Sequence, residues 1–401
     1  MHFADVHFGV ENYGRFDPET GLNSRLVDFR NALNAAIDLA LSMGIDLAVF
    51  AGDAYKARDP SQTQQREFAQ CLRKLTQEGV PVVLLAGNHD IPNMRGRANS
   101  IEIFAALAGN LVTVLDKPCL HIVRSRSGQD VQIAAMPYLI KSVVLSREES
   151  RNKGIEETNQ LIVDQYTEEI SSLADRCDPD LVTILMGHFS AENATMSAYS
   201  PVNSLTEPVV PLSSLTRRPF DYVALGHIHR YQTLNKGEQP PVVYSGSIER
   251  IDFGERQEEK VFVYAEVSKG SAQFEHVEVS TRPFVQIDCD LTASGENPTE
   301  VLLREIARHN LKNAVVKLQF RILSEQTPYL RENEVRSALD SSYLVVAIQR
   351  DVVRTLERQR SKALTESLDP LLALAAYCDL QPALKDRKEE MLDAARQLIK
   401  L

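Results

Sequence analysis

The sequence lacks the features that mark membrane, secreted and nucleotide-hydrolysing proteins. It holds no run of about eighteen apolar residues, and its first residues do not form a basic segment followed by an apolar one, so we expect neither a membrane span nor secretion. The five cysteines are scattered and never stand at metal-knuckle spacing, which favours a reducing cytosol. A Gly-x-x-x-x-Gly-Lys-Ser/Thr loop is also missing, so any dependence on ATP has to come from another chain.

An excess of positive charge is missing as well. The formal net charge of −11 argues against a protein that simply coats nucleic acid. With 43% hydrophobic and 25% charged residues, the 401-residue chain has the composition of an ordinary soluble protein, with room for two or three domains.

The most informative stretch that is present is Pro81–Asp90. It begins with a short continuous apolar run, as expected of a strand that is covered on both faces. Gly87 then turns the chain, and Asn88, His89 and Asp90 present an amide, an imidazole and a carboxylate in succession. The carboxyl end of a central strand is where open α/β folds keep their chemistry. Taken alone, this stretch fits a polar turn and a functional site about equally well.

Polar side chains follow four more predicted strands. Asp5 and His7 follow a very short first strand, and alternation in an extended segment would put both on one face. The other sets are Gly52-Asp53 after Leu47–Phe50, Gly187-His188 after Leu181–Met186, and Gly226-His227-Ile228-His229 after Tyr222–Leu225. His227 and His229 are expected to share a face for the same reason. With helices predicted between the first strands, the order is β-α-β-α-β, which implies a parallel sheet.

Five of the nine histidines stand just after a predicted strand, which is hard to obtain by structural accident. A single histidine in such a place would more often be a satisfied core or turn residue. The five are His7, His89, His188, His227 and His229. Imidazole and oxygen ligands without thiolate suit Mn²⁺, Fe²⁺ or Zn²⁺ better than Mg²⁺ or Ca²⁺.

The remaining chain predicts two further parts. The segments predicted as antiparallel strands that close the first domain are Val242–Ser245, Val261–Val267 and Gln273–Val279. From Arg282 the alternating short strands and helices predict a small separate α/β domain, and beyond Val353 the pattern is helical.

The helical end carries two apolar stripes. The first consists of Leu364, Leu368, Leu371, Leu372 and Ala375, and the second of Leu384, Met391, Leu392, Ala395, Leu398 and Ile399. Two short helices cannot bury both stripes fully against each other. We therefore expect the remaining face to meet a partner helix, or else to pack on the chain's own second domain.

The five motifs together resemble the calcineurin-like metallophosphoesterase superfamily. They are Asp5-x-His7, Gly52-Asp53, Gly87-Asn88-His89-Asp90, Gly187-His188 and Gly226-His227-x-His229, in that order. The resemblance implies an α/β fold of the α+β sandwich type, with a four-layer metallophosphoesterase domain that binds two metal ions. It implies two Mn²⁺ ions, with Fe²⁺ or Zn²⁺ as alternatives.

The same resemblance implies roles for the individual residues. One metal would be held by Asp5, His7, Asp53 and His229, and the other by Asp53, Asn88, His188 and His227. Asp53 would bridge the two ions. His89 would be a catalytic residue that binds no metal and stabilises charge or protonates the leaving oxygen. Asp90 is grouped with His89, either behind the ligands or as a plain turn residue.

Within that superfamily the chain most resembles the SbcD-type nuclease subunit of double-strand-break repair complexes. The stretch Tyr244–Glu255 closely matches the signature that follows the last histidines in those nucleases. The implied organisation is a nuclease domain at 1–281, a DNA-facing capping domain at 282–353, and a helical segment at 354–401 that binds an SbcC-like ABC-type ATPase.

This resemblance also implies that DNA is the substrate and that the protein is cytoplasmic and associated with the nucleoid, with no membrane partner. A homodimer would form through the helices near Gln62–Leu75 and Ser100–Leu107, whose patterns equally suit helices packed on their own sheet.

Two departures and two alternatives accompany this hypothesis. After Gly52-Asp53 the chain has Lys56 near the place where many relatives have a histidine or carboxylate, and the first strand is shorter than usual.

One alternative is a stand-alone metallophosphodiesterase or phosphatase acting on nucleotides or phosphoproteins, although such an enzyme has no need of the extra domain and helices. The other is a catalytically silent scaffold, which the intact ligand positions disfavour.

Overall fold

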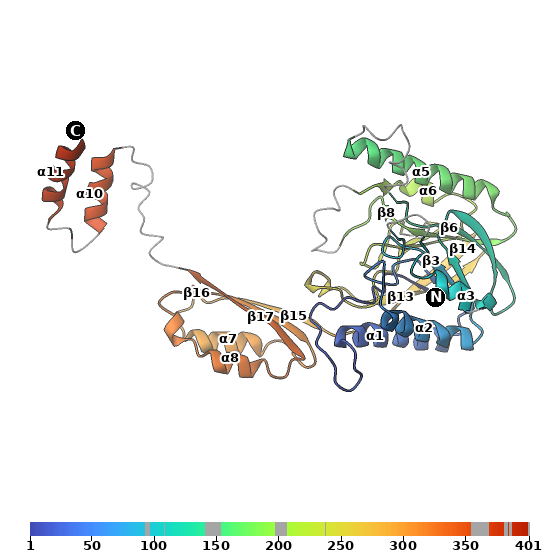
Figure 1. The fold of residues 1–401 in the computed structure, drawn as a ribbon, viewed down its shortest axis with the longest axis horizontal. Helices are drawn as coiled ribbons and strands as arrows, with labels where there is room; N and C mark the ends of the chain where they lie inside the picture. Colours follow the sequence, from blue (N-terminus) through green and yellow to red (C-terminus); the bar gives the residue numbers. More distant parts are fainter. Residues whose placement is uncertain are drawn as a thin grey trace. The chain divides into compact units, whose positions relative to one another are not determined.

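The computed structural model divides the chain into two compact units, Met1–Val285 and Gln286–Leu401 (Figure 1). It describes residues 1–92, 97–107, 109–140, 154–196, 207–236, 238–353, 369–380, 384 and 387–399. Among the described helices, none combines the length and apolar character that crossing a bilayer requires.

The first unit contains two six-stranded sheets, and the first of these is built around the start of the chain. Its strand order is β14 (Ser271–Glu278), β13 (Val261–Ser268), β1 (His2–Phe3), β2 (Ala48–Phe50), β3 (Val82–Leu85) and β4 (Val112–Leu115). The strands β1 to β4 run parallel to one another, while β13 is antiparallel to both β1 and β14. The predicted β-α-β-α-β unit is therefore confirmed.

The second sheet is mixed and carries the later motifs. Its order is β11 (Gln232–Thr233), β12 (Val242–Tyr244), β10 (Tyr222–Gly226), β7 (Val182–His188), β6 (Asp130–Met136) and β5 (Cys119–Arg124). Residues 242–245 were predicted to form an antiparallel closing strand. This is wrong for the pairing with β10, because β12 runs parallel to β10 and is antiparallel only to β11. A separate two-stranded ladder joins β8 (Ser190–Ala191) to β9 (Val209–Val210).

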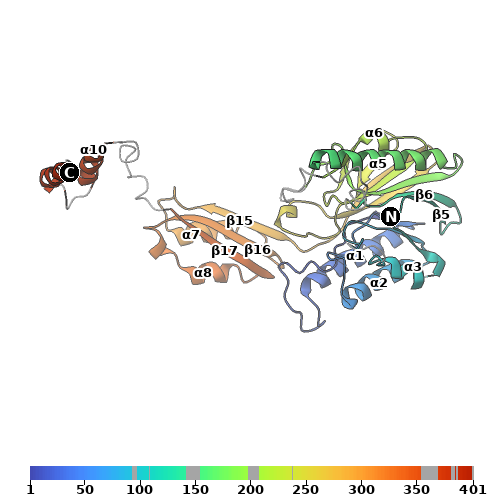
Figure 2. The same cartoon turned by 45° about the horizontal axis from the view of Figure 1, so that its top comes forward.

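Helices cover the outer faces of the two sheets (Figure 2). One face carries α1 (Ser24–Ser42) and α2 (Gln62–Gln77), and the other carries α5 (Ile155–Arg176) and α6 (Leu212–Leu215). Both α1 and α2 begin at side chains that bind free backbone amides: Asn23 accepts from Arg25, and Ser61 forms a capping box with Gln64. Shorter helices of this unit are α3 (Glu102–Leu107) and the 3₁₀ helices Gly109–Leu111 and Phe253–Glu255.

Three buried apolar clusters hold the layers together. Representative members are Phe29, Phe50 and Phe68 beneath α1 and α2, Val83, Ile184 and Val263 between the sheets, and Ile170, Phe189 and Val223 beneath α5. Burial of large apolar side chains on both faces of each sheet accounts for the continuous apolar runs in the sequence. The predicted four-layer sandwich is confirmed.

The second unit begins with a three-stranded sheet in the order β15 (Phe284–Asp290), β16 (Val315–Leu323) and β17 (Leu344–Val353). β16 and β17 are parallel. The helices of this part are α7 (Pro298–Ile306) and α8 (Glu332–Ala338), with a 3₁₀ helix at Thr327–Tyr329. Leu302, Leu318 and Val335 are buried, so this part has an apolar core of its own.

Two helices, α10 (Pro370–Leu380) and α11 (Lys388–Ile399), end the described chain and contact each other. Leu364 and Leu368 of the first predicted stripe lie outside the described residues. Cys378 and Leu392 are buried, whereas Leu372 is 63% and Leu398 73% exposed.

Candidate metal centre

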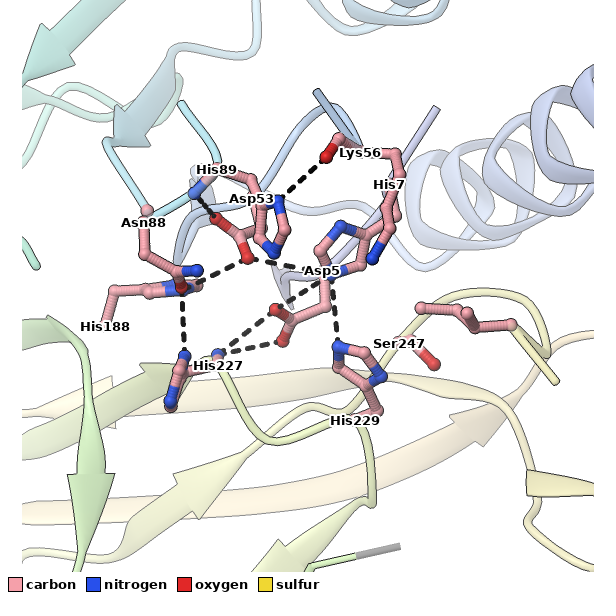
Figure 3. A network of polar contacts seen from close by, with 12 residues as sticks. Asp5, His7, Asp53, Lys56, Asn88, His89, His188, His227, His229 and Ser247 are labelled. Atoms are coloured by element: carbon pink, nitrogen blue, oxygen red, sulfur yellow. Dashed lines mark hydrogen bonds and ion pairs between the residues drawn. The ribbon is translucent and has the colours of Figure 1, made fainter. Parts of the chain in front are cut away.

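Every candidate ligand stands at or just beyond the carboxyl end of a strand, and the ligands come from both sheets (Figure 3). The first sheet supplies Asp5 and His7 after β1, Asp53 after β2 and Asn88 after β3. The second supplies His188 at the end of β7, and His227 and His229 after β10. These strand ends meet at one edge of the sandwich, which is why residues far apart in the sequence lie together.

Several of these residues have strained backbones. Asp5, His7, Asp53 and His227 have positive φ angles of 51°, 49°, 63° and 91°. Such conformations cost about 1–3 kcal/mol each in residues other than glycine, and they persist only where surrounding contacts impose them. The predicted extended alternation of Asp5 with His7 is therefore wrong.

Backbone hydrogen bonds across the sheet impose the conformation of the first motif. The amide of Asp5 donates to the Gly52 carbonyl at 2.9 Å, and that of His7 donates to the Asp53 carbonyl at 3.1 Å. These contacts tie the backbone of both residues to the loop after β2. The strain thus follows from tertiary structure and lies where the candidate ligands gather.

One group of ligand atoms joins the start of the chain to the end of the last motif. Nε2 of His7 lies 3.1 Å from Nε2 of His229 and 3.8 Å from a carboxylate oxygen of Asp5. Asp5, His7 and His229 each offer one ligand atom, and these atoms lie within 4.8 Å of one another. This is the grouping predicted for one metal, apart from the bridging Asp53.

A second group forms around Asn88. Its Oδ1 atom lies 3.0 Å from Nε2 of His188 and 3.1 Å from Nδ1 of His227. The His227 ring thus faces Asn88, whereas the His229 ring faces His7, and the φ of 91° at His227 departs from the extended backbone that alternation assumes. The backbone amide of His227 is occupied separately, because it donates to the Asp5 carboxylate at 3.0 and 3.2 Å.

Asp53 lies between the two groups. Its Oδ2 atom is 3.6 Å from Nε2 of His7 and 3.4 Å from Nε2 of His188. Its Oδ1 atom accepts the backbone amide of His89 at 2.8 Å. Burial opposes ionisation of Asp53, but the charge and hydrogen bond of His188 hold the pKa of this carboxyl well below its usual range. The carboxylate is therefore in a position to contact a cation in each group.

The chemistry of the donors fits a divalent cation. Nδ1 of His188 lies 2.7 Å from the carbonyl oxygen of Ala51, so it carries a hydrogen, and the ring directs Nε2 at Asn88 and Asp53. Lone pairs at these separations repel one another unless a proton or a cation lies between them. Burial lowers the pKa of His188, but the charge of Asp53 outweighs it and raises this pKa to about 9. A divalent ion would replace that proton.

His89 lies at the edge of the centre. Its Nδ1 atom donates to the carbonyl oxygen of Lys56 at 2.8 Å, and its ring packs edge-on against His7 with the centroids 5.0 Å apart. The other ring nitrogen points into the cluster in Figure 3. A ligand atom of His89 also lies within 4.8 Å of His7 and Asp53, so the ring is close enough to act on anything bound there.

Asp90 is completely buried and faces the backbone rather than the ligands. Its carboxylate accepts the amides of Asp53 at 2.8 Å, Gly87 at 3.0 Å and Ala54 at 3.0 Å, and the hydroxyl of Ser100 at 3.3 Å. Asp90 therefore positions the loops that carry Asp53 and Asn88. This place fits both roles that were left open for Asp90, behind the ligands or as a turn residue.

Two glutamates contact the candidate ligands and were not singled out from the sequence. Glu207 lies 2.9 Å from Nε2 of His227, and Glu255 lies 2.9 Å from Nδ1 of His229. Glu255 is the last residue of Tyr244–Glu255, the stretch that resembles the nuclease signature. That stretch is the sequence signal that could have identified it. Glu207 lies twenty residues before its histidine, and no local pattern links the two.

Comparisons with known proteins identify a matching family and several relatives. The model of the calcineurin-like phosphoesterase family matches residues 1–231. The DNA double-strand break repair protein Mre11 of Thermoplasma acidophilum is 24% identical over 329 residues, covering 80% of this chain and 76% of that protein. The SbcD component of the nuclease SbcCD of Escherichia coli K12 is 26% identical over 303 residues, covering 73% and 71%. The corresponding SbcCD component of Bacillus subtilis is 28% identical over 265 residues, covering 64% and 62%.

Proposed function

Because the chain belongs to the calcineurin-like phosphoesterase family, we propose that it is a metal-dependent DNA nuclease. It would hydrolyse phosphodiester bonds within a double-strand-break repair complex, together with an SbcC-like ATPase. The observation that carries the proposal is the convergence of candidate ligands from both sheets around Asp53. The names of the similar repair nucleases support DNA as the substrate.

The ligands would divide between two ions. Asp5, His7 and His229 would hold one, and Asn88, His188 and His227 the other, with Asp53 contacting both. This set of nitrogen and oxygen donors favours Mn²⁺, with Fe²⁺ and Zn²⁺ as alternatives. When bound, such a pair of ions supplies an activated water and neutralises charge on a transferred phosphoryl group.

His89 would act on the same phosphoryl group without holding an ion. Because its Nδ1–H bonds the Lys56 carbonyl, the neutral ring presents a lone pair at Nε2 and the protonated ring presents an N–H. A positioned imidazole of this kind can stabilise developing charge or move a proton to the leaving oxygen.

DNA would reach the centre past two exposed cations. Lys56 and Arg58 lie on the loop after Asp53, and Nε of Arg58 donates to the backbone carbonyl of Asn88 at 3.1 Å. Positive side chains held beside the ligands can position a phosphate backbone without reading the sequence of bases. In this proposal they compensate locally for a chain whose net charge is −11.

Three further parts of the proposal concern assembly. The domain at 282–353 would cap the DNA, and the helices α10 and α11 would bind the ATPase with exposed apolar residues such as Leu372. A homodimer would use the surface near α2 and α3, where Ile103 is 47% exposed. The apolar face of α2, with Phe68 and Leu72, is already used against the chain's own sheet. The complex would work in the cytoplasm at the nucleoid.

The proposal is tested by digesting linear and hairpin duplex DNA with Mn²⁺, with and without the ATPase and ATP. We expect metal-dependent cleavage that the ATPase and ATP increase. Cleavage of a small phosphodiester without any cleavage of duplex DNA, even with the partner present, would favour a stand-alone phosphodiesterase.

A further inference from the structure

We infer that Glu255 is a positioning residue for His229, fixing its ring and thereby selectively strengthening one of the two metal sites, with Lys260 as its buried counter-charge. This inference rests on the proposed two-metal function. It concerns the cluster formed by Ser247, Glu255 and Lys260, which lies behind His229.

The two oxygens of the Glu255 carboxylate have separate partners. Oε1 lies 2.9 Å from Nδ1 of His229. Oε2 accepts from Nζ of Lys260 at 2.7 Å, from Oγ of Ser247 at 3.1 Å and from the amide of Ile251 at 3.1 Å. Three donors on one oxygen leave the other free to face the imidazole, so the carboxylate cannot turn without breaking several hydrogen bonds.

This arrangement fixes which nitrogen of His229 is available to a metal. A carboxylate oxygen only accepts, so Nδ1 of His229 carries the hydrogen and the lone pair is on Nε2. Nε2 is the atom that faces His7 at 3.1 Å. Hydrogen bonding of the distal nitrogen to a carboxylate also makes an imidazole a stronger donor to a metal.

The same cluster holds the backbone of His229. Its carbonyl oxygen accepts the amide of Ser247 at 2.9 Å and Nζ of Lys260 at 3.4 Å. Figure 3 shows Ser247 beside His229, on the side away from Asp53. The ring and the main chain of His229 are thus restrained from one direction by three connected residues.

The charges of the cluster would be strongly destabilising without a partner. Lys260 is 1% exposed and Glu255 is 3% exposed, and ions this deeply buried lose much of their hydration, a loss that pairing offsets only in part. Nζ of Lys260 lies 2.7 Å from Oε2 of Glu255 and 3.2 Å from the Glu258 carboxylate, so the buried amine is paired on two sides. Lys260 therefore compensates the charge of the carboxylate that faces Nδ1 of His229.

The effect is confined to one half of the centre. His188 is oriented by the Ala51 carbonyl and His227 contacts Glu207, so neither depends on Glu255. Loss of Glu255 should consequently weaken the site that contains His229 and leave the other unchanged.

The test is a titration of metal-free full-length protein with Mn²⁺, followed by calorimetry and by electron paramagnetic resonance. We expect the wild type to bind two ions, and Glu255→Ala to bind one normally and the other about 10- to 100-fold more weakly. At subsaturating Mn²⁺ the variant should give the spectrum of isolated ions rather than of a coupled pair.

A matched control removes a carboxylate from the same lysine without touching His229. Glu258 lies 3.2 Å from Nζ of Lys260 and its side chain is 13% exposed. Glu258→Gln should bind both ions as the wild type does. An equal loss of affinity in Glu258→Gln and Glu255→Ala would show that any disturbance of the ion pair suffices, and would overturn the inference.

A pair of double variants keeps the test decisive if Glu255→Ala leaves Lys260 unpaired and fails to fold. Glu255→Ala with Lys260→Met and Glu255→Gln with Lys260→Met both lack the ion pair, but only the second keeps an oxygen that can accept from Nδ1. We expect the double variant with glutamine at position 255 to bind the ion at the His229 site more tightly than the double variant with alanine there. Identical affinities in the two variants would refute a positioning role, whereas a wild type that binds fewer than two ions would refute the proposed function itself.

Discussion

The carboxylate of Asp90 accepts the backbone amide of Asp53 at 2.8 Å. Asp90, in the loop after β3, thereby holds the main chain of Asp53, which lies between the two groups of candidate ligands. Burial and the charge of Asp53 raise the pKa of Asp90, and the amides of Gly87 and Asp53 partly offset this. The burial of this carboxylate is unfavourable by itself, but its hydrogen bonds fix two loops at once.

Asp90→Asn should destabilise the protein more than it alters the chemistry. The amide would direct an N–H₂ group at donors that now face a carboxylate oxygen, leaving at least one buried donor unsatisfied. We expect a loss of about 1–3 kcal/mol in the free energy of unfolding, measured with urea. A variant that is as stable as the wild type but has lost all activity would instead assign Asp90 a direct catalytic role.

Asp53→Ala should remove or misplace both ions, because one carboxylate faces ligands of both groups. Metal content after dialysis against Mn²⁺ is the measurement. Two ions at normal occupancy, together with normal activity, would contradict the assignment of Asp53 as the shared ligand.

His89→Ala should keep both ions and lose about 10²–10⁴ in rate, because a general acid or charge stabiliser is removed while the ligands stay. The rate is measured on a small phosphodiester at saturating Mn²⁺, alongside metal content. If the variant loses an ion, His89 is a ligand. Its ring lies close enough to His7 and Asp53 to share an ion with them.

Gly87→Ala should disturb Asp53 directly. A Cβ atom at residue 87 would stand 2.2 Å from Oδ1 and 2.5 Å from the amide nitrogen of Asp53, and contacts this short force one of the two to move. We expect lower Mn²⁺ affinity and lower stability.

Gly154→Ala serves as the control, because nothing lies within 4 Å of the added atom. Equal Mn²⁺ affinity in the two alanine variants would mean that the loop of Gly87 yields without moving Asp53.

Ending the chain after Arg354 should separate the two activities of the complex. Cleavage of a small phosphodiester should survive, whereas binding of the ATPase and ATP-dependent cutting of duplex DNA should vanish. Leu372→Asp and Leu398→Asp are milder variants, since both leucines are largely exposed. Normal binding of the ATPase by the shortened chain would mean that the helical end has no part in the contact.

Much of the sandwich was predictable because its strands are buried on both faces. The runs before Asp53 and Asn88 are apolar and short, as expected of strands covered on both faces, so local pattern and final structure agree. The gathering of the candidate ligands at one edge was expected, since parallel strands bring their carboxyl ends together, whereas their division between two ions is implied by the family resemblance.

The remainder depends on contacts that no local pattern records. The left-handed backbone of Asp5 and His7 is imposed by carbonyls of the Asp53 loop, and alternation therefore failed there. The parallel pairing of β12 is set by its place beside β10 rather than by its own residues. Lys260 reads as an ordinary surface lysine, yet it is buried because Glu255 and Glu258 surround its amine.

The separation of the ligands along the chain has a consequence for folding kinetics. His7 and His229 meet although they stand 222 positions apart in the sequence, and each belongs to a different sheet. Contacts of such long range form late, so no complete site exists until the two sheets have packed together. Mn²⁺ should therefore leave the refolding rate unchanged and slow unfolding, because the ions bind only after the sandwich has assembled.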